Sequence, residues 1–255
     1  MMRYFQAWRE RRILTRFPVS EPDWQYALAG CAPARRLDAS DQARLRVLAT
    51  LFLHEKAVEP VQSLELSSAA RTLLATHACL LILKLGMEWY RDWHSVIVYP
   101  DLFIPQRPQV DMAGVVHQHQ HVLAGEAWSQ GPVILSWQEV TSAGQPPGHN
   151  VTVHEMAHKL DMLNGEANGY PPLHAGMKQS DWSNAFTDAW QSMQAAWRTG
   201  HALPIDTYGL QSPAEFFAVT SELFFEQPAR LRLHLPELYS QLSRFYRQRP
   251  LPDVA

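Results

Sequence analysis

The segment from Val151 to Asp161 constrains the fold more than any other part of the chain, because its two histidines can act together only on a helix. It reads VTVHEMAHKLD, with no glycine or proline inside it. Asn150 is a favoured N-cap residue, and Asn164-Gly165 can end the helix. The sequence therefore predicts a helix from Val151 to about Gly165.

Within this helix, residues 154–158 form the pattern His-Glu-x-x-His. Residues four apart lie on one helix face, one turn apart, so His154 and His158 can hold one metal ion together. Glu155, next to the first histidine, can reach a water molecule on that metal and act as a general base. Asp161 lies on the same face. It is either a surface charge or an acceptor for the free ring N–H of a ligand histidine.

A catalytic zinc ion takes three protein ligands and keeps one position open, so a third ligand is needed. A helix predicted from Ser212-Pro213 to about residue 225 carries Glu215 and Glu222, seven residues apart on one face. Ser212 and Glu215 also have the spacing of a capping box, which would occupy the Glu215 carboxylate. Asp206 is a weaker candidate. The residues alone leave the choice between these carboxylates open.

The composition is that of a globular protein with a sizeable core. The chain has 255 residues, of which 46% are hydrophobic and 18% are charged. We expect one domain, 1–255, with a mainly helical part at 1–95 and the sheet, the metal-binding helix and the glutamate-bearing helix at 96–255. The net charge of −3 argues against direct nucleic-acid binding, which needs a basic surface. We find neither a membrane-spanning stretch nor a signal sequence, so we expect a cytoplasmic protein.

Hydrophobic periodicity predicts an α+β fold that is mostly helical, with a small mixed sheet beside the His-Glu-x-x-His helix. The predicted helices cover residues 40–56, 67–86, 151–165, 181–198 and 213–225. The predicted strands cover residues 95–99, 115–123 and 131–137. Three tryptophans of the 181–198 helix are expected on its core face: Trp182, Trp190 and Trp197.

Six longer motifs extend the evidence beyond the metal-binding helix. They are FLHEK at 52–56, ACLLILKLGMEWY at 78–90, VIVYPDLF at 96–103, GPVILSW at 131–137, HEMAHKLDMLNG at 154–165 and SPAEFFAVTSELFFEQP at 212–228. In this order they resemble the Mlc titration factor A family of bacteria, over about residues 17–250.

The resemblance implies a zinc-dependent metallopeptidase, of the aminopeptidase type, with one Zn²⁺ per chain. It implies a zincin-like catalytic fold similar to the protease domain of anthrax lethal factor. It also implies a cytoplasmic protein that binds peptide substrates and the transcriptional repressor Mlc, and so modulates expression of the glucose phosphotransferase system genes.

The family pattern further implies roles for individual residues. In that pattern the third metal ligand is a glutamate on a later helix, with a tyrosine seven residues before it. Glu215 and Tyr208 match this spacing. Glu215 then completes the metal site, and Glu222 either supports a ligand or packs structurally. Tyr208 either donates its hydroxyl to the developing oxyanion or packs as an ordinary aromatic residue.

Substrate binding is predicted from the middle of the chain. The strand Val133–Trp137 precedes the metal-binding helix, and by resemblance to zinc peptidases an extended peptide is expected to pair with it. The free amine of an aminopeptidase substrate needs an anionic partner. The residues leave four candidates open: Glu126, Glu139, Asp161 and Glu222.

A run of alternating histidines lies in the predicted strand 115–123. Side chains two apart on a strand point to the same side. The run is therefore either a polar, exposed strand face or a second metal site. It comprises His117, His119 and His121.

A second class of function is a non-catalytic protein that sequesters the repressor, with a structural or gated zinc site. A structural zinc ion is closed by a fourth protein ligand and needs no base beside it. The presence of Glu155 therefore favours catalysis.

Overall fold

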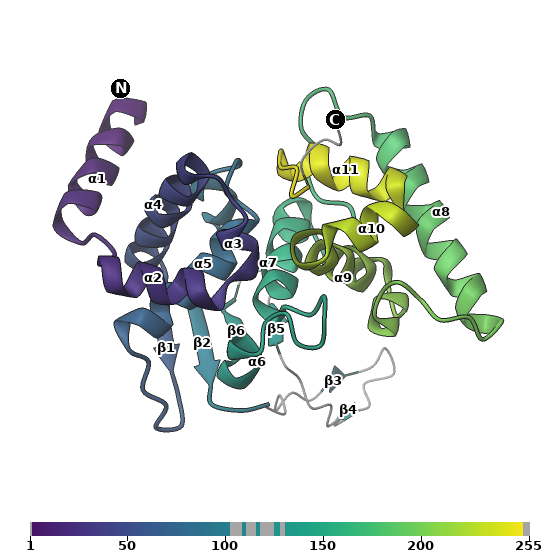
Figure 1. The fold of residues 1–255 in the computed structure, drawn as a ribbon, viewed down its shortest axis with the longest axis horizontal. Coiled ribbons are helices and arrows are strands. Elements are labelled where there is room, and N and C mark those ends of the chain that lie inside the picture. Colours follow the sequence, from purple (N-terminus) through teal and green to yellow (C-terminus); the bar gives the residue numbers. More distant parts are fainter. Residues whose placement is uncertain (1, 103–108, 111–115, 118–124, 128–130, 252–255) are drawn as a thin grey trace.

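Helices lie at both ends of the chain and a small sheet lies in its middle (Figure 1). The computed structural model describes residues 2–102, 109–110, 116–117, 125–127 and 131–251. The helices are α1 (Met2–Arg16), α2 (Glu21–Gly30), α3 (Ala32–Arg35), α4 (Ala39–Glu55), α5 (Ser68–Leu80), α6 (Trp137–Thr141), α7 (Val151–Asp161), α8 (Gln179–Arg198), α9 (Pro213–Glu226), α10 (Pro228–His234) and α11 (Pro236–Tyr246). The strands are β1 (Ala57–Pro60), β2 (Ser95–Tyr99), β3 (Gln109–Val110), β4 (Val116–His117), β5 (Gly125–Ala127) and β6 (Val133–Ser136). None of the helices within these ranges is both long and apolar enough to cross a membrane.

Four strands form the central sheet, in the order β1-β2-β6-β5. β1, β2 and β6 run parallel, and β5 runs antiparallel to β6, so the sheet is mixed. β2 and β6 confirm the strands predicted at 95–99 and 131–137, and the α+β class is confirmed with them. The strand predicted at 115–123 lies mostly outside the described residues. Its part Val116–His117 pairs with Gln109–Val110 in a separate two-stranded sheet.

The position of β6 corrects the expectation that substrate pairs with it. β6 has β2 on one side and β5 on the other, so both of its hydrogen-bonding edges are occupied. A peptide can add only to a free strand edge. All four residues of β6 are buried, as expected for a strand that is covered on both faces. Among the described strands, β5 is the sheet edge that contacts α7.

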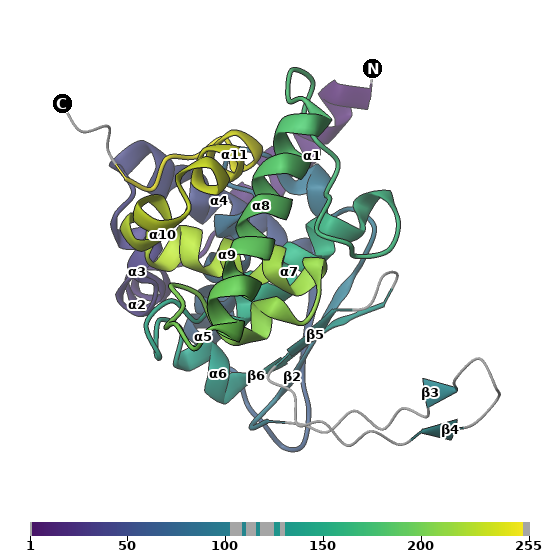
Figure 2. The ribbon, with the colours of Figure 1, turned by 90° about the vertical axis from the view of Figure 1, so that its right-hand side faces the viewer.

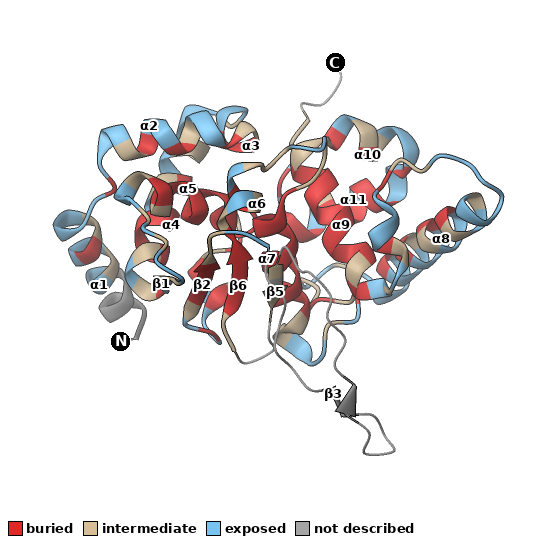
Figure 3. Cartoon of the chain, turned by 90° about the horizontal axis from the view of Figure 1, so that it is seen from below, coloured by how far each residue is buried: buried red, intermediate tan, exposed pale blue. Residues whose placement is uncertain are grey.

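The helix α7 is buried along its whole length. It contacts β5 and β6 of the sheet as well as α5 and α9, and buried residues dominate this central region (Figure 3). The predicted cap is confirmed, because Asn150 Oδ1 accepts the Val153 N–H at 3.1 Å. A 3₁₀ turn, Met162–Asn164, follows α7 and ends at Gly165. One cluster of buried hydrophobic residues extends from Ile13 to Tyr246 and surrounds these elements.

Two predicted helix boundaries differ from the structure. α4 begins one residue before the predicted start at residue 40, because Asp38 is its cap: Asp38 Oδ1 accepts the Asp41 N–H at 2.8 Å. α5 is capped by Ser67 and ends at Leu80, six residues before the end of the predicted helix 67–86. Turns fill residues 81–85, so the apolar run there is buried without being helical.

The C-terminal helices pack around α9, and α8 lies across it when viewed from that side (Figure 2). Trp182 of α8 is fully buried and stacks on Phe186 at 4.3 Å between ring centroids, and it also contacts Phe217 of α9. Trp190 is half-buried, whereas Trp197 is 55% exposed. The expected core face is therefore correct for Trp182 and wrong for Trp197, because α8 extends beyond the helices that cover it.

Candidate metal centre and active site

The two histidines of α7 point to one place, as their spacing predicts. His154 Nε2 and His158 Nε2 are 3.2 Å apart, one helical turn from each other. Both side chains are buried, and the helix that carries them is fixed at its start by the Asn150 cap. The pair therefore presents two nitrogen donors from a rigid element.

Glu215 brings a carboxylate to the same place from the first turn of α9. Its Oε2 lies 3.0 Å from His154 Nε2 and 3.4 Å from His158 Nε2. Ser212 Oγ accepts the Glu215 backbone N–H at 3.2 Å, so Ser212 caps α9 while the Glu215 carboxylate faces the histidines. Burial acts to raise the pKa of Glu215, but hydrogen bonds from both histidines outweigh it and hold the pKa at about 2.

The three donor atoms have the spacing that a zinc ion requires. They are 3.0–3.4 Å apart. Tetrahedral zinc with bonds of about 2.0–2.1 Å places its ligand atoms about 3.3 Å from one another. Two imidazole nitrogens and one carboxylate oxygen are also a donor set found in catalytic zinc sites. His154, His158 and Glu215 therefore fit a zinc ion in both geometry and chemistry.

A second carboxylate, Glu222, lies behind His154. Glu222 is two turns after Glu215 on α9, and its Oε1 lies 2.8 Å from His154 Nδ1. Its other oxygen, Oε2, accepts the Asn150 backbone N–H at 2.5 Å and lies 3.2 Å from His149 Nδ1. A proton on His154 Nδ1, directed at Glu222, leaves the Nε2 lone pair for a metal ion.

His149 extends this network to a third carboxylate and was not identified from the sequence. Its Nε2 lies 3.2 Å from Glu139 Oε2, while its Nδ1 faces Glu222. Both ring nitrogens thus face carboxylates, an arrangement that needs both to carry protons. The hydrogen bond to Glu222 is the largest cause of the raised pKa of His149. A lone histidine in the loop before α7 gives no signal of this role in the sequence.

Asp161 makes no described hydrogen bond to His154 or His158. Its Oδ2 accepts the backbone N–H groups of Asn168 at 2.8 Å and of Gly169 at 2.7 Å. Among the described residues, His158 Nδ1 has no hydrogen-bond partner. Gly169 has φ +76° and packs so tightly that a Cβ there would lie 2.5 Å from the Pro213 carbonyl oxygen. Asp161 therefore holds the loop after α7 against the start of α9, which carries Glu215.

Glu155 lies beside the three donors, with its carboxylate buried. Its Oε2 has no hydrogen-bond partner among the described residues. Burial is the main reason that the pKa of Glu155 is raised to about 7, close to the value that suits a general base at neutral pH. Gly125 of β5 packs directly against it, because a Cβ at Gly125 would lie 2.5 Å from Glu155 Oε1. A glycine within a strand is the sequence signal of such a close approach.

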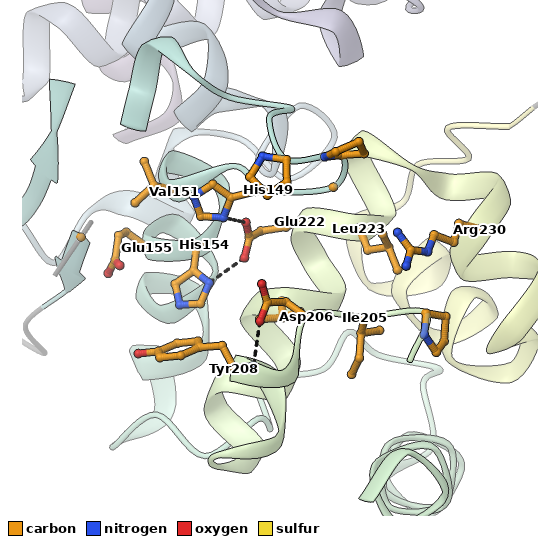
Figure 4. Close-up of a pocket in the computed structure, with 16 residues that line it drawn as sticks. His149, Val151, His154, Glu155, Ile205, Asp206, Tyr208, Glu222, Leu223 and Arg230 are labelled. Carbon is orange, nitrogen blue, oxygen red and sulfur yellow. Dashed lines mark hydrogen bonds and ion pairs between the residues drawn. The ribbon is translucent and has the colours of Figure 1, made fainter. Parts of the chain in front are cut away.

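Tyr208 lies on the other side of His154, in the 3₁₀ turn Thr207–Leu210. Its ring centroid is 5.8 Å from that of His154, and the residue is 40% exposed (Figure 4). Burial and the nearby glutamates raise the pKa of its hydroxyl to about 12, so the hydroxyl keeps its proton at neutral pH. Asp206 Oδ1 accepts the Tyr208 N–H at 2.8 Å and caps this turn.

Several of these groups line one cavity of about 540 Å³. His154, Glu155, Tyr208, His149 and Glu222 face it, together with apolar side chains from α7 and α9 (Figure 4).

The four acidic side chains that were candidates to hold a substrate amine differ in their surroundings. Glu139 contacts His149, Glu222 contacts His154 and His149, and Asp161 holds the loop after α7. The side chain of Glu126 lies outside the described residues, as do the side chains of the histidine run 117–121.

Together, the buried His-Glu-x-x-His helix, the converging glutamate of a later helix and the adjoining cavity are the features of a metallopeptidase site. Comparison with known proteins agrees with this class. The model of the glucose-regulated metallo-peptidase M90 family matches residues 5–247. The chain belongs to the glucose-regulated metallo-peptidase M90 family.

Three relatives that carry the name Mlc titration factor A illustrate the similarity. The protein of Salmonella arizonae is 38% identical over 249 residues, which cover 95% of this chain and 96% of the relative. The protein of Escherichia fergusonii is 36% identical over 232 residues, 90% of this chain and 87% of the relative. The protein of Klebsiella pneumoniae is 36% identical over 234 residues, which cover 91% of this chain and 88% of the relative. The similarity thus covers nearly the whole of each protein.

Proposed function

We propose that this protein is a zinc-dependent peptidase of the aminopeptidase type, with a zincin-like catalytic centre. The observation that carries the proposal is the convergence of three donor atoms, 3.0–3.4 Å apart, beside a buried glutamate. His154, His158 and Glu215 are the proposed ligands of one Zn²⁺. When bound there, zinc supplies a Lewis acid that polarises a peptide carbonyl and makes water more acidic.

The side chains around the metal ligands then have distinct tasks. Glu155 takes a proton from the attacking water and later gives it to the leaving amine. Tyr208 donates its hydroxyl to the oxygen of the scissile carbonyl as negative charge develops, a contact worth about 3–4 kcal/mol in comparable sites. Glu222 holds the His154 ring in the orientation and tautomer that direct Nε2 to the metal.

The edge strand β5 is the proposed docking site for the substrate backbone. β5 is the described edge of the sheet on the α7 side, and Gly125 brings its backbone against the Glu155 carboxylate. An extended peptide that adds to such an edge gains main-chain hydrogen bonds, while its scissile bond lies beside the base. This proposal replaces the expected pairing with β6.

A regulatory role is proposed together with the enzymatic one. Relatives with 36–38% identity carry the name Mlc titration factor A. We infer from this name that the present chain also binds the repressor Mlc, in the cytoplasm, and so modulates expression of the glucose phosphotransferase system genes. A protein that only sequesters the repressor has no need for a buried carboxylate such as Glu155 next to a metal site, so the geometry favours catalysis.

The aminopeptidase type is tested with a peptide that has a free amino terminus and its N-acetylated copy. The zinc-loaded protein is incubated with each, with and without Mlc, and the products are identified by mass spectrometry. Stepwise release of amino-terminal residues from the free peptide alone is the expected result. Equal internal cleavage of both peptides would contradict the aminopeptidase type. No cleavage of either, with or without Mlc, would contradict peptidase activity itself.

A further inference from the structure

The cavity at the candidate active site extends past the metal ligands into a pocket with apolar walls. Val151 contributes from α7, Val219 and Leu223 from α9, and Ile205 from the segment before Tyr208. All four side chains are buried, and the fold brings together the three segments that carry them. In Figure 4 the pocket lies between Leu223 and Ile205, to the right of His154.

The opposite end of this pocket is cationic. Arg230 of α10 lines it, and its guanidinium is directed toward Leu223 (Figure 4). Its described hydrogen bonds are to neutral groups, Gln227 Oε1 at 3.4 Å and the Leu203 carbonyl at 3.3 Å. The acidic groups of the cavity lie nearer the metal ligands: Glu155, Glu222 and Asp206, which caps the turn of Tyr208.

The pocket is continuous with the groups that would act on a peptide bond. His154, Glu155 and Tyr208 line the same cavity as the apolar walls. A scissile bond held at these three residues therefore places the side chain of a flanking residue at the pocket entrance. About 540 Å³ lies within the range of pockets that enclose small organic ligands, so a large side chain can enter.

We propose that this pocket selects substrates with a large apolar side chain, of the size of leucine, methionine or phenylalanine, at one of the two residues that flank the scissile bond. The proposal rests on the proposed peptidase function and gives its substrate class. Apolar walls favour burial of such a side chain over glycine or alanine. Lysine and arginine are excluded, because their charge would lose water among apolar walls and face Arg230.

Binding to an inactive variant tests the pocket without turnover. Zinc-loaded Glu155→Gln is titrated calorimetrically with two series of tripeptides, X-Ala-Ala and Ala-X-Ala, where X is Gly, Ala, Leu, Phe or Lys. In one series, the Leu and Phe peptides are expected to bind at least roughly tenfold more tightly than the Gly peptide. The Lys peptide is expected to bind no more tightly than the Gly peptide. Equal affinities in both series, or no binding at all, would overturn the proposal.

A matched pair of substitutions locates the selectivity. Leu223→Trp fills the pocket and is expected to reduce the Phe-to-Gly affinity ratio at least roughly fivefold. Leu233→Trp makes the same change at a position of α10 that is 76% exposed, and should keep the ratio. Melting curves of both variants verify folding. An unchanged Phe-to-Gly affinity ratio in folded Leu223→Trp would overturn the proposal.

The pocket and the peptidase function can be refuted independently of each other. Wild-type protein that hydrolyses Gly, Ala, Leu and Phe substrates at equal kcat/KM would retain the proposed function and refute the pocket. Binding selectivity in Glu155→Gln, with no hydrolysis by the wild type, would retain the pocket and refute the function.

Discussion

Replacement of Glu222 by glutamine tests how the network behind the metal ligands works. Both carboxylate oxygens of Glu222 accept hydrogen bonds: Oε1 faces His154 Nδ1, and Oε2 faces the Asn150 N–H. A glutamine has nearly the same volume but only one acceptor oxygen. Its NH₂ group must therefore face one of these two donors.

Either orientation of the glutamine has a cost. If the NH₂ group faces His154, Nδ1 must accept and the proton moves to Nε2, where the metal needs a lone pair. If it faces Asn150, two donors meet at the buried start of α7, which costs about 1–3 kcal/mol. Loss of such a supporting contact typically weakens metal binding about 10–100-fold, or about 1.4–2.7 kcal/mol. We expect Glu222→Gln to fall in this range.

The assay is competition for zinc with a chromogenic chelator, performed in parallel on wild type and Glu222→Gln. Glu237→Gln, on an exposed position of α11, is the matched control and should bind zinc as the wild type does. Thermal melting of the metal-free proteins verifies that the variant folds. Wild-type zinc affinity in folded Glu222→Gln would refute the argument that Glu222 sets the tautomer of His154.

Three further predictions concern the site and its support. Glu215→Ala should lose zinc, measured by metal analysis after dialysis; full occupancy would mean that Glu215 is not a metal ligand. Gly125→Ala should keep zinc but lower kcat/KM at least roughly tenfold, because the new Cβ would lie 2.5 Å from Glu155 Oε1; unchanged rates would show that β5 adjusts freely. Burial lowers the pKa of His77 to about 4, below the ordinary histidine pKa of about 6.5. The unfolded chain therefore binds the extra proton first, and stability falls as the pH drops from about 6.5 toward 4. In urea unfolding, the wild type should lose about 2 kcal/mol more between pH 7 and pH 5 than His77→Gln; equal losses would contradict a neutral, buried His77.

Local sequence signals were sufficient for the central helix and two strands. α7 is defined by an N-cap, an uninterrupted helical pattern and a terminal glycine, all within sixteen residues. β2 and β6 are β-branched or apolar runs bounded by turn residues. β1 and β5 were missed because β1 contains Pro60 and β5 has only three residues, beginning at Gly125. The pairing partner of β1 is β2, which follows only after α5 in the chain, so no local pattern identifies β1.

The two glutamates of α9 show what spacing cannot decide. Seven residues apart, Glu215 and Glu222 share one face of the helix, and the residues alone left open which would meet the histidines. The structure brings both to His154, Glu215 to Nε2 and Glu222 to Nδ1. This division depends on how α9 crosses α7, which is a property of tertiary packing. The contacts of His149 depend on the same packing.

Glu155 is the proposed base of a zinc peptidase. Its most direct test compares wild type and Glu155→Gln on a panel of aminoacyl chromogenic substrates, with zinc content measured in both. We predict equal zinc in the two proteins, hydrolysis by the wild type, and a loss of at least about 100-fold in kcat in the variant. Turnover retained in Glu155→Gln at equal zinc would contradict the assignment of Glu155.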